Sequence, residues 1–403
     1  MKGEANQPVE GAPAPLAETA QAAQALLDQL LDAALQLRAT DVHVEPQADK
    51  LTIRLRVEGV LRFWKEVPLD LHPQVVGRLK SLAKLDVAER RRPQEGRFTQ
   101  ATKSGVREYR VATAPMLDGE KVVVRVLHQD LSEITLKNIG YSEPNARAYS
   151  DLLSKPHGLI LHCGPTGSGK TSALYAAINH LKQNWRNIQT IEDPVEGRLS
   201  GINQAQVNGE LGQSCATFLR SFLLQDCDVI MVDELRDPES AQLAFQAAHS
   251  GHLVLASLQA KSAVAAFSRL HELRVPQFFI HASLVGLVGH RMTRRVCKAC
   301  RRVFQPSAQI QRECNLLPHH QLYQAVGCTQ CGKLGYRGRI GLQEVIAIDP
   351  QLREAIQAGA LEDELYALAA QSGMISLFTD GVAKCVAGYT TVEEVYQTIM
   401  AGD

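Results

Sequence analysis

The sequence has 403 residues, 45% of them hydrophobic and 21% charged, which is typical of a globular protein with two or three domains. Lysine plus arginine and aspartate plus glutamate number 43 each, so the zero net charge argues against a chain-wide nucleic-acid-binding surface. No apolar run is long enough to span a bilayer and no secretory signal begins the chain, so we expect a cytoplasmic protein without direct membrane insertion.

The N-terminal part of the chain is predicted to be a small α+β domain behind a disordered tail. Residues 1–16 are rich in Ala, Pro, Glu and Gly, which disfavours a packed core. Apolar spacing and strand alternation define the elements that follow. They are a helix over 17–37, a hairpin over 51–57 and 60–64, a helix over 74–87, and a strand pair over 107–114 and 121–127.

A phosphate-binding loop is the most specific motif of the chain. The run is Gly164-Pro165-Thr166-Gly167-Ser168-Gly169-Lys170-Thr171, with an apolar strand before it and a helix start after it. Glycines allow backbone N–H groups to close around phosphate oxygens. Lys170 is then expected to reach the β- and γ-phosphates, and the Thr171 hydroxyl to bind Mg²⁺. The motif predicts binding of a nucleoside triphosphate.

The surrounding pattern predicts an α/β domain. Short apolar strands alternate with helical segments, so a parallel sheet covered on both faces is expected. Helices are expected to close the chain from about residue 350 to 400. The predicted strands cover 159–163, 188–191, 229–232 and 253–257.

Two acidic clusters follow apolar strands. Asp233 and Glu234 end the third of these strands, and we expect Glu234 to polarise the attacking water and Asp233 to assist Mg²⁺. The alternative for this pair is a solvated turn. The second cluster is Glu192, Asp193 and Glu196, and its spacing leaves a functional site and a proline-stopped turn equally open.

Four cysteines have the spacing of a metal site. Cys297 and Cys300 form one C-x-x-C pair, and Cys328 and Cys331 form a second after 27 intervening residues. Two such pairs can complete a tetrahedron around a structural Zn²⁺. Unligated thiols and a disulfide are the alternatives, and the long gap disfavours a DNA-reading finger.

Arginines of the first domain offer a further hypothesis. The run Arg90–Arg97 is by default a solvated basic loop. The sharper hypothesis is that an arginine here, such as Arg97, or else Arg110 or Arg125, reaches the γ-phosphate in a neighbouring subunit.

Together these residues resemble the type II secretion and type IV pilus extension ATPase family (GspE/PilB-like), from about Thr40 to the C-terminus. Further motifs of the family occur in the family's order. They are Thr40–Pro46 (opening of the N2 domain), Arg92–Arg97 (arginine loop), Thr190–Glu196 (Asp box), Asp228–Glu234 (Walker B), Gly251–Leu255 (leading into the His box) and Gly335–Gly341 (metal-bearing tail).

The resemblance implies a RecA-like P-loop NTPase fold with a small N-terminal PAS-like α+β domain, a zinc-binding insert and a C-terminal helical region. The implied domains are N2 over 17–130, a linker over 131–139 and an ATPase domain over 140–403, with a zinc subdomain over 297–331 and helices over 345–403. An earlier N1 domain, present in many relatives, is expected to be absent.

The implied activity is ATP hydrolysis, with Mg²⁺ and a structural Zn²⁺, by a homohexameric motor at the cytoplasmic side of the inner membrane. Glu192, Asp193 and Glu196 would then help to place Mg²⁺ and water. The implied partner is the inner-membrane platform protein of a type IV pilus or a type II secretion pseudopilus, and a mixed ring with a paralogous motor is an alternative assembly. The metal-bearing tail favours the extension or secretion branch.

Three positions depart from the family pattern. Gln259 replaces the histidine of the His box, Asp233 replaces a glycine before Glu234, and Leu224 replaces an arginine. Glutamine cannot titrate near neutral pH, and a second carboxylate repels its neighbour. The alternative function is therefore a slow or inactive nucleotide-binding subunit with a structural or regulatory role. A DNA-handling ring ATPase is a weaker alternative, which the balanced charge disfavours.

Overall fold

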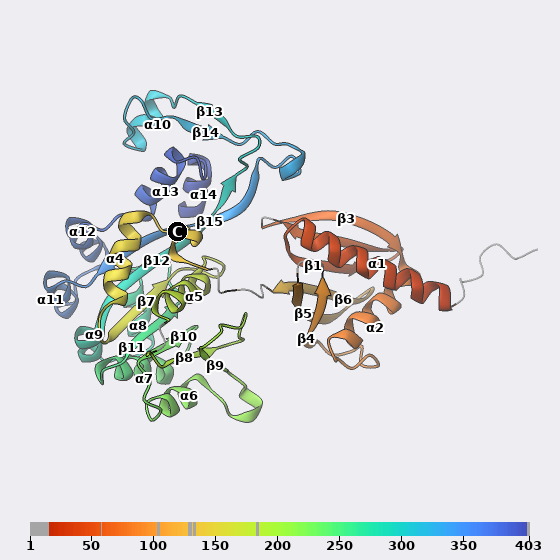
Figure 1. Ribbon diagram of the computed structural model, residues 1–403, viewed down its shortest axis with the longest axis horizontal. Coiled ribbons are helices and arrows are strands. Elements are labelled where there is room, and N and C mark those ends of the chain that lie inside the picture. The colour runs from red at the N-terminus through yellow and green to blue at the C-terminus, as the bar shows by residue number, and fades with distance from the viewer. Residues whose placement is uncertain are drawn as a thin grey trace, which may run out of the picture. The chain divides into compact units, whose positions relative to one another are not determined.

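The computed structural model describes residues 16–57, 59–102, 105–127, 131, 134–182 and 185–400 (Figure 1). The chain forms two compact units, residues 1–129 and 130–403. All but the last residue of the predicted tail 1–16 lies outside the described residues.

The first unit is one six-stranded antiparallel sheet with two helices. Its strand order is β3-β2-β1-β6-β5-β4. The predicted hairpin is confirmed, because β2 and β3 pair with Val57 opposite Val60. The elements are α1 (Leu16–Gln36), β1 (Ala39–Pro46), β2 (Lys50–Val57), β3 (Val60–Pro68), α2 (His72–Leu82), β4 (Gln94–Thr102), β5 (Gly105–Met116) and β6 (Gly119–Leu127).

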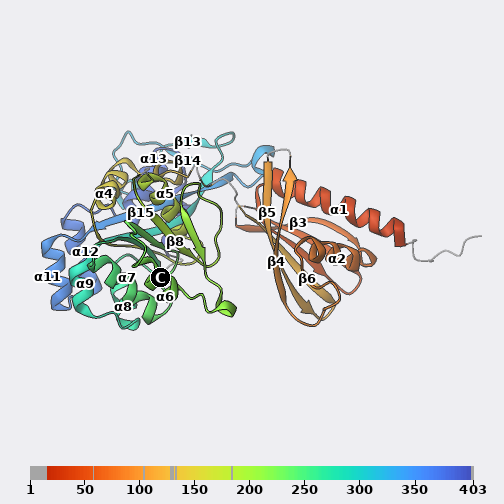
Figure 2. The ribbon, with the colours of Figure 1, turned by 60° about the horizontal axis from the view of Figure 1, so that its bottom comes forward.

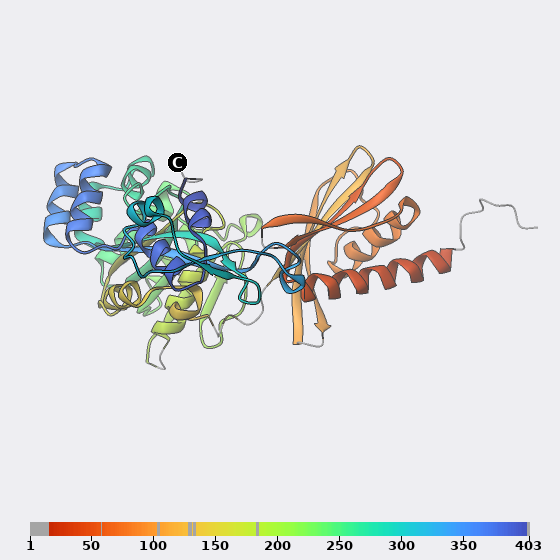
Figure 3. The ribbon, with the colours of Figure 1, turned by 90° about the horizontal axis from the view of Figure 1, so that it is seen from above.

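The core of this unit lies between the sheet and its two helices (Figure 3). Leu30 of α1 and Leu79 of α2 are fully buried against alternate strand residues such as Val44 and Ile53. One face of β1 and of β2 is therefore apolar, and the other face carries charged side chains. This division follows from the period of two in a strand.

Two predictions for this unit are wrong in detail. The helix predicted over 74–87 ends at Leu82, because Lys84 adopts a left-handed φ of 58° and Leu85 N bonds back to Lys80 O. The basic run is an exposed loop at residues 90–93, as predicted, but residues 94–97 belong to β4, where Arg97 pairs with Arg110 of β5. Cross-strand pairing, which a single sequence does not display, makes this stretch a strand.

The second unit is built on a seven-stranded sheet of order β15-β12-β7-β11-β10-β8-β9, parallel except for the pairing of β12 with β15. The four predicted strands are confirmed as β7, β8, β10 and β11, whereas β9, β12 and β15 were not predicted. The strands are β7 (Gly158–Cys163), β8 (Ile188–Glu192), β9 (Asn203–Gln206), β10 (Val229–Val232), β11 (Leu253–Leu258), β12 (Leu284–Val296) and β15 (Tyr336–Ala347).

Helices cover both faces of this sheet, as predicted (Figure 2). Leu161 of β7 packs with Phe245 of α7 on one face, and Ile160 packs with Leu174 of α5 on the other. The helices before residue 300 are α3 (Leu136–Ile139), α4 (Glu143–Leu153), α5 (Lys170–Leu181), α6 (Cys215–Phe222), α7 (Pro238–His249), α8 (Ala266–Glu272) and α9 (Gln277–Ser283).

The segment predicted as a linker, 131–139, belongs to this second unit, where Leu131 and Leu136 are buried in the core. The cysteine-bearing insert holds the small hairpin of β13 (Arg302–Phe304) and β14 (Leu322–Gln324) and the helix α10 (Ala308–Glu313). The closing helices are α11 (Pro350–Ala358), α12 (Glu362–Gln371), α13 (Leu377–Val386) and α14 (Val392–Met400). Among the helices described here, none is both long and apolar enough to cross a bilayer.

Candidate functional site: a phosphate loop, an acidic edge and a tetracysteine cluster

The phosphate-binding loop joins the interior strand β7 to α5, as the motif predicts. Gly169 has a φ of 93°, and a Cβ there would lie 2.7 Å from Met292 Cε. A Cβ on Gly164 would lie 2.4 Å from Ser168 Oγ and 2.7 Å from His290 O. The loop therefore passes so close to its neighbours that larger residues do not fit at these positions.

Lys170 and Thr171, the first residues of α5, face the loop and the acidic strand. Lys170 Nζ donates to Gly164 O at 2.8 Å and to Pro165 O at 3.0 Å. Burial lowers the pKa of Lys170. The Thr171 hydroxyl donates to Asp233 Oδ1 at 3.1 Å, so the motif's hydroxyl and a carboxylate lie together. Both are oxygen ligands of the kind that Mg²⁺ prefers.

Asp233 and Glu234 follow β10 at the carboxyl edge of the parallel sheet. Burial and then repulsion from Glu196 raise the pKa of Asp233 to about 7. Glu234 is paired with Arg236, whose Nε lies 2.8 Å from Glu234 Oε2, and Nη1 of the same arginine lies 2.6 Å from Asp193 Oδ2. Arg236 thus links the two acidic clusters.

A cavity of about 320 Å³ lies between the loop and these acids, and we call it the phosphate cavity. Of the residues predicted from sequence, it brings together five from the loop and three acids. It also includes four residues that were not predicted as site residues. The lining residues are Thr166, Gly167, Gly169, Lys170, Thr171, Glu196, Asp233 and Glu234, joined by Ser172, Ser257, Met292 and Arg339.

Glu192, predicted to be catalytic, does not line the phosphate cavity and is 1% exposed. Its carboxylate accepts from the Thr190 hydroxyl at 2.5 Å, from Gln204 Nε2 at 2.9 Å and from the Tyr175 hydroxyl. The Tyr175 oxygen also accepts from Glu196 N at 3.3 Å. Glu192 is therefore an anchor for the segment that presents Glu196 to the cavity.

Of the four unpredicted residues, Ser172 directly follows the loop motif on α5, and the other three come from strands far along the chain. Ser257 of β11 donates its hydroxyl to the carbonyl of Asp233. Met292 lies on β12 and Arg339 lies on β15. The glycine-rich run around Arg339 is the sequence feature that could have indicated this residue. Gln259 Nε2 lies 3.4 Å from Thr166 Oγ1 at the edge of the loop, and Leu224 is 88% exposed.

The candidate arginines of the first unit are paired within it. Arg97 lies 3.5 Å from Glu108, and Arg110 Nε lies 2.5 Å from Glu95. Their reach toward a second subunit stays a prediction.

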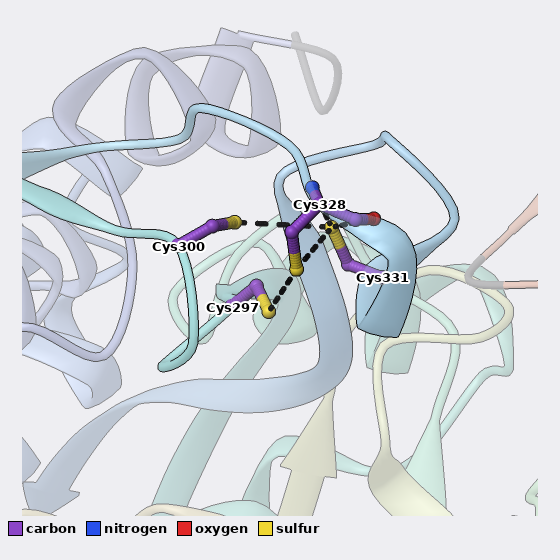
Figure 4. Close-up of side chains that lie close together, drawn as sticks. All are labelled: Cys297, Cys300, Cys328 and Cys331. Carbon is purple, nitrogen blue, oxygen red and sulfur yellow. Dashed lines mark hydrogen bonds between the residues drawn. The ribbon is translucent and has the colours of Figure 1, made fainter.

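The four cysteines predicted to bind a metal meet in one place. Their sulfurs all lie within 4.8 Å of one another, and the side chains point toward one another from two chain segments (Figure 4). Three sulfur pairs are separated by 4.0 Å (Cys297 and Cys328), 3.8 Å (Cys300 and Cys331) and 3.8 Å (Cys328 and Cys331). A Zn–S bond of about 2.3 Å in a tetrahedron requires sulfurs about 3.8 Å apart. We call this group the tetracysteine cluster, and its geometry fits zinc.

Solved structures similar to this chain have the same fold. The X-ray structure of the Legionella pneumophila ATPase DotB aligns with a TM-score of 0.68 at 18% identity and covers 94% of this chain and 96% of that chain. The crystal structure of the pilus retraction motor PilT with bound ADP aligns with a TM-score of 0.62 at 22% identity, over 92% and 96% of the two chains.

Curated relatives are more similar in sequence. Type II secretion system protein E of Pseudomonas aeruginosa is 40% identical over 375 residues, which are 92% of this chain and 74% of that protein. The type IV pilus assembly ATPase PilB of Thermus thermophilus is 37% identical over 393 residues, and the match spans 96% of this chain but 44% of that protein. Residues 17–397 match the family described as Type II/IV secretion system protein, so this chain belongs to that family.

Proposed function

We propose that this chain is the ATP-hydrolysing motor of a type IV pilus or type II secretion assembly system. The observation that carries the proposal is the phosphate cavity of about 320 Å³, which Lys170 and Thr171 line together with Asp233 and Glu234. Among similar proteins, one is named a type IV pilus assembly ATPase and another a type II secretion system protein E. The chain is an ATPase of their family.

Each residue of the phosphate cavity has a proposed role. The loop N–H groups and Lys170 bind the β- and γ-phosphates. Thr171 and Asp233 hold Mg²⁺, which supplies charge neutralisation on those phosphates when bound. Glu234 orients the attacking water and accepts its proton, and Arg236 holds the Glu234 carboxylate toward the cavity. Glu196 contributes a further carboxylate for Mg²⁺-bound water.

Zn²⁺ is the proposed occupant of the tetracysteine cluster. Four thiolates complete its coordination, so the ion has a structural role and no open position for substrate. The four thiols titrate as one interacting group. Burial opposes ionisation of Cys331, but N–H groups of Cys328 and Gly335 at 3.1 and 3.2 Å and bonds from neighbouring thiols lower its pKa to about 6, whereas burial and bonds to the other three thiols raise the pKa of Cys300 to about 11.

The proposed assembly is a homohexameric ring at the cytoplasmic side of the inner membrane, acting on a platform protein. Arg97 and Arg110 on β4 and β5 are the proposed groups for the γ-phosphate of a neighbouring subunit. This role requires them to exchange their pairing with Glu108 and Glu95 for phosphate.

A second candidate function is a slow nucleotide-binding subunit, alone or in a mixed ring with a paralogous motor. Asp233 favours it, because a protonated carboxyl with a pKa of about 7 is a poorer Mg²⁺ ligand than a carboxylate. Gln259 beside Thr166 also favours it, since an amide cannot exchange a proton there.

Steady-state phosphate release distinguishes the two. For the motor, Glu234→Gln should lower kcat by at least about 100-fold while fluorescent ATP still binds, and Lys170→Ala should abolish binding. Glu143→Gln is the matched control, because among the described residues that glutamate forms an ion pair with Arg147 alone, on the exposed side of α4. Equal, very slow release by wild type and Glu234→Gln would identify the slow subunit, and absence of nucleotide binding by the folded wild type would contradict both.

A further inference from the structure

We propose that the tetracysteine cluster, when it holds its metal, positions Arg339 in the phosphate cavity, so that metal binding and triphosphate binding strengthen each other. The inference rests on the proposed nucleotide site. The tetracysteine cluster and the phosphate loop are far apart in the sequence. Arg339 is the phosphate-binding side chain through which they are coupled.

The first observation is that the two strands next to the cluster, β12 and β15, each contribute a residue to the lining of the phosphate cavity. Cys297 follows β12 directly, and β12 carries Met292 into the cavity. β15 begins at Tyr336, five residues after Cys331, and carries Arg339 into the same cavity. The strands β12 and β15 form one antiparallel pair (Figure 1), and short stretches of these two strands join the cluster to the cavity.

The cluster also fixes the start of β15 by backbone bonds. Cys297 N donates to Gly335 O at 2.8 Å, and Gly335 N donates to Cys331 Sγ at 3.2 Å. The β12–β15 ladder is irregular at this point, with a register shift between Arg294 and Val296. Closure of this end of the strand pair therefore depends on the cluster as well as on the ladder.

The backbone of Arg339 is paired in the β12–β15 ladder, but its side chain is not held by a polar contact among the residues that the structure describes. Its side chain is exposed, with no hydrogen bond or ion pair to any of them. Across the ladder it faces Arg294, a like charge, which is itself held by Glu394 at 2.9 Å and lies over the Tyr336 ring at 4.3 Å. The path of the β15 backbone therefore decides where the Arg339 guanidinium lies.

That backbone is glycine-rich and is held at both ends. Gly335 and Gly338 adopt φ values of 79° and 83°, which other residues rarely adopt. Beyond Arg339, Ile340 is buried and Gly341 O accepts from Lys384 Nζ at 2.7 Å. Loss of the metal releases the Gly335 end only, so we expect Arg339 to become mobile while the sheet beyond Gly341 persists.

The test is a double-mutant cycle on nucleotide affinity. In the Glu234→Gln background, which prevents hydrolysis, fluorescent ATP is titrated into the zinc-loaded full chain, into Cys297→Ser/Cys300→Ser, into Arg339→Gln and into the combination. We expect about 5- to 30-fold weaker binding for either change and no further loss when they are combined. Arg337→Gln is the matched control, because Arg337 lies two residues away on the same strand but does not line the cavity.

Hydrogen exchange supplies a readout independent of nucleotide and of the cysteine variants. Wild type with zinc and wild type stripped by a chelator are compared, and faster exchange is expected in residues 332–339, with residues 342–347 unchanged. Additive losses in the cycle, or equal exchange with and without zinc, overturn the inference. A zinc-loaded wild type that binds no nucleotide overturns the proposed function instead, which separates the two failures.

Discussion

The hydroxyl of Thr171 donates a hydrogen bond to Oδ1 of Asp233 at 3.1 Å and joins the end of the phosphate loop to the end of β10. These residues are 62 positions apart in the chain and lie on one carboxyl edge of the sheet. The bond favours the carboxylate form of Asp233, but burial and the carboxylates of Glu196, Glu192 and Glu234 disfavour it more strongly.

Replacement of Asp233 should therefore change how stability depends on pH. The pKa of Asp233 is about 7 in the folded protein, above its ordinary value of 3.8, so the unfolded chain releases this proton first as pH rises. Between pH 5 and pH 8 the wild type should lose about 3 kcal/mol of unfolding free energy relative to Asp233→Asn. Urea unfolding with EDTA, at both pH values, measures the difference. A difference that is constant with pH would contradict the shifted pKa.

Tyr175→Phe should lower both the free energy of unfolding and the apparent affinity of the site for Mg²⁺. The change leaves buried Glu192 without one donor and Glu196 N without its acceptor, at a cost of about 1–3 kcal/mol. Because the segment bearing Glu196 loosens, the Mg²⁺ concentration for half-maximal phosphate release should rise several-fold.

Tyr149→Phe is the control for that experiment. Tyr149 is equally buried, and its hydroxyl bonds to His162 Nε2 at 2.7 Å, away from the acidic clusters. It should lose similar stability without a change in the Mg²⁺ requirement. If both variants shift that requirement equally, Tyr175 has no specific effect on the acidic segment.

Removal of one partner from the buried pair of Lys384 and Asp380 should be strongly destabilising. Lys384 Nζ bonds to Asp380 Oδ2 and also to Gln343 Oε1 at 3.1 Å, and both charged residues are 5% exposed or less. Lys384→Met should cost about 3–5 kcal/mol, because a buried carboxylate then lacks its counter-charge. Thermal unfolding of Asp380→Asn and of the double variant checks this, since the double loss should be smaller than the sum of the single losses.

Arg236→Gln should slow hydrolysis without preventing nucleotide binding. The arginine holds Glu234 at 2.8 Å and Asp193 at 2.6 Å, so its loss leaves the Glu234 carboxylate free to rotate. We expect kcat to fall about 10- to 100-fold while KM for ATP changes by less than about threefold. Arg147→Gln, which removes an exposed pair on α4, should change neither constant. A rise in KM alone would instead make Arg236 a substrate-binding residue.

Much of the second unit follows from local patterns. The loop motif identifies Lys170 and Thr171, and apolar runs ending in acids identify Asp233 and Glu234. These groups meet because β7 and β10 are parallel strands of one sheet, whose carboxyl ends share an edge. The C-x-x-C spacing likewise predicts that the four cysteines come together, because each pair needs only one tight turn to present two thiolates to a metal.

Apart from Ser172, which directly follows the loop motif, the cavity residues missed by sequence analysis have a common origin. Ser257, Met292 and Arg339 reach the phosphate cavity from three strands that follow the loop by about 90 residues or more. The position of Glu192 outside the cavity lining could not be predicted either, because its burial and its bond to Tyr175 depend on the packing of α5 against β8. The pairing of strands that are distant in the sequence leaves no local periodic pattern in the sequence. The burial of a residue at the end of a strand leaves none either.

By itself, the sequence determined that this protein has a phosphate loop, carboxylates at strand ends and four cysteines spaced for a metal, because each depends on neighbouring residues and backbone geometry. Only the tertiary structure decided which carboxylates face the phosphate cavity and that β12 and β15 connect it to the tetracysteine cluster. Those outcomes depend on strand order and register, which arise from packing across the whole sheet and are not encoded in any single segment.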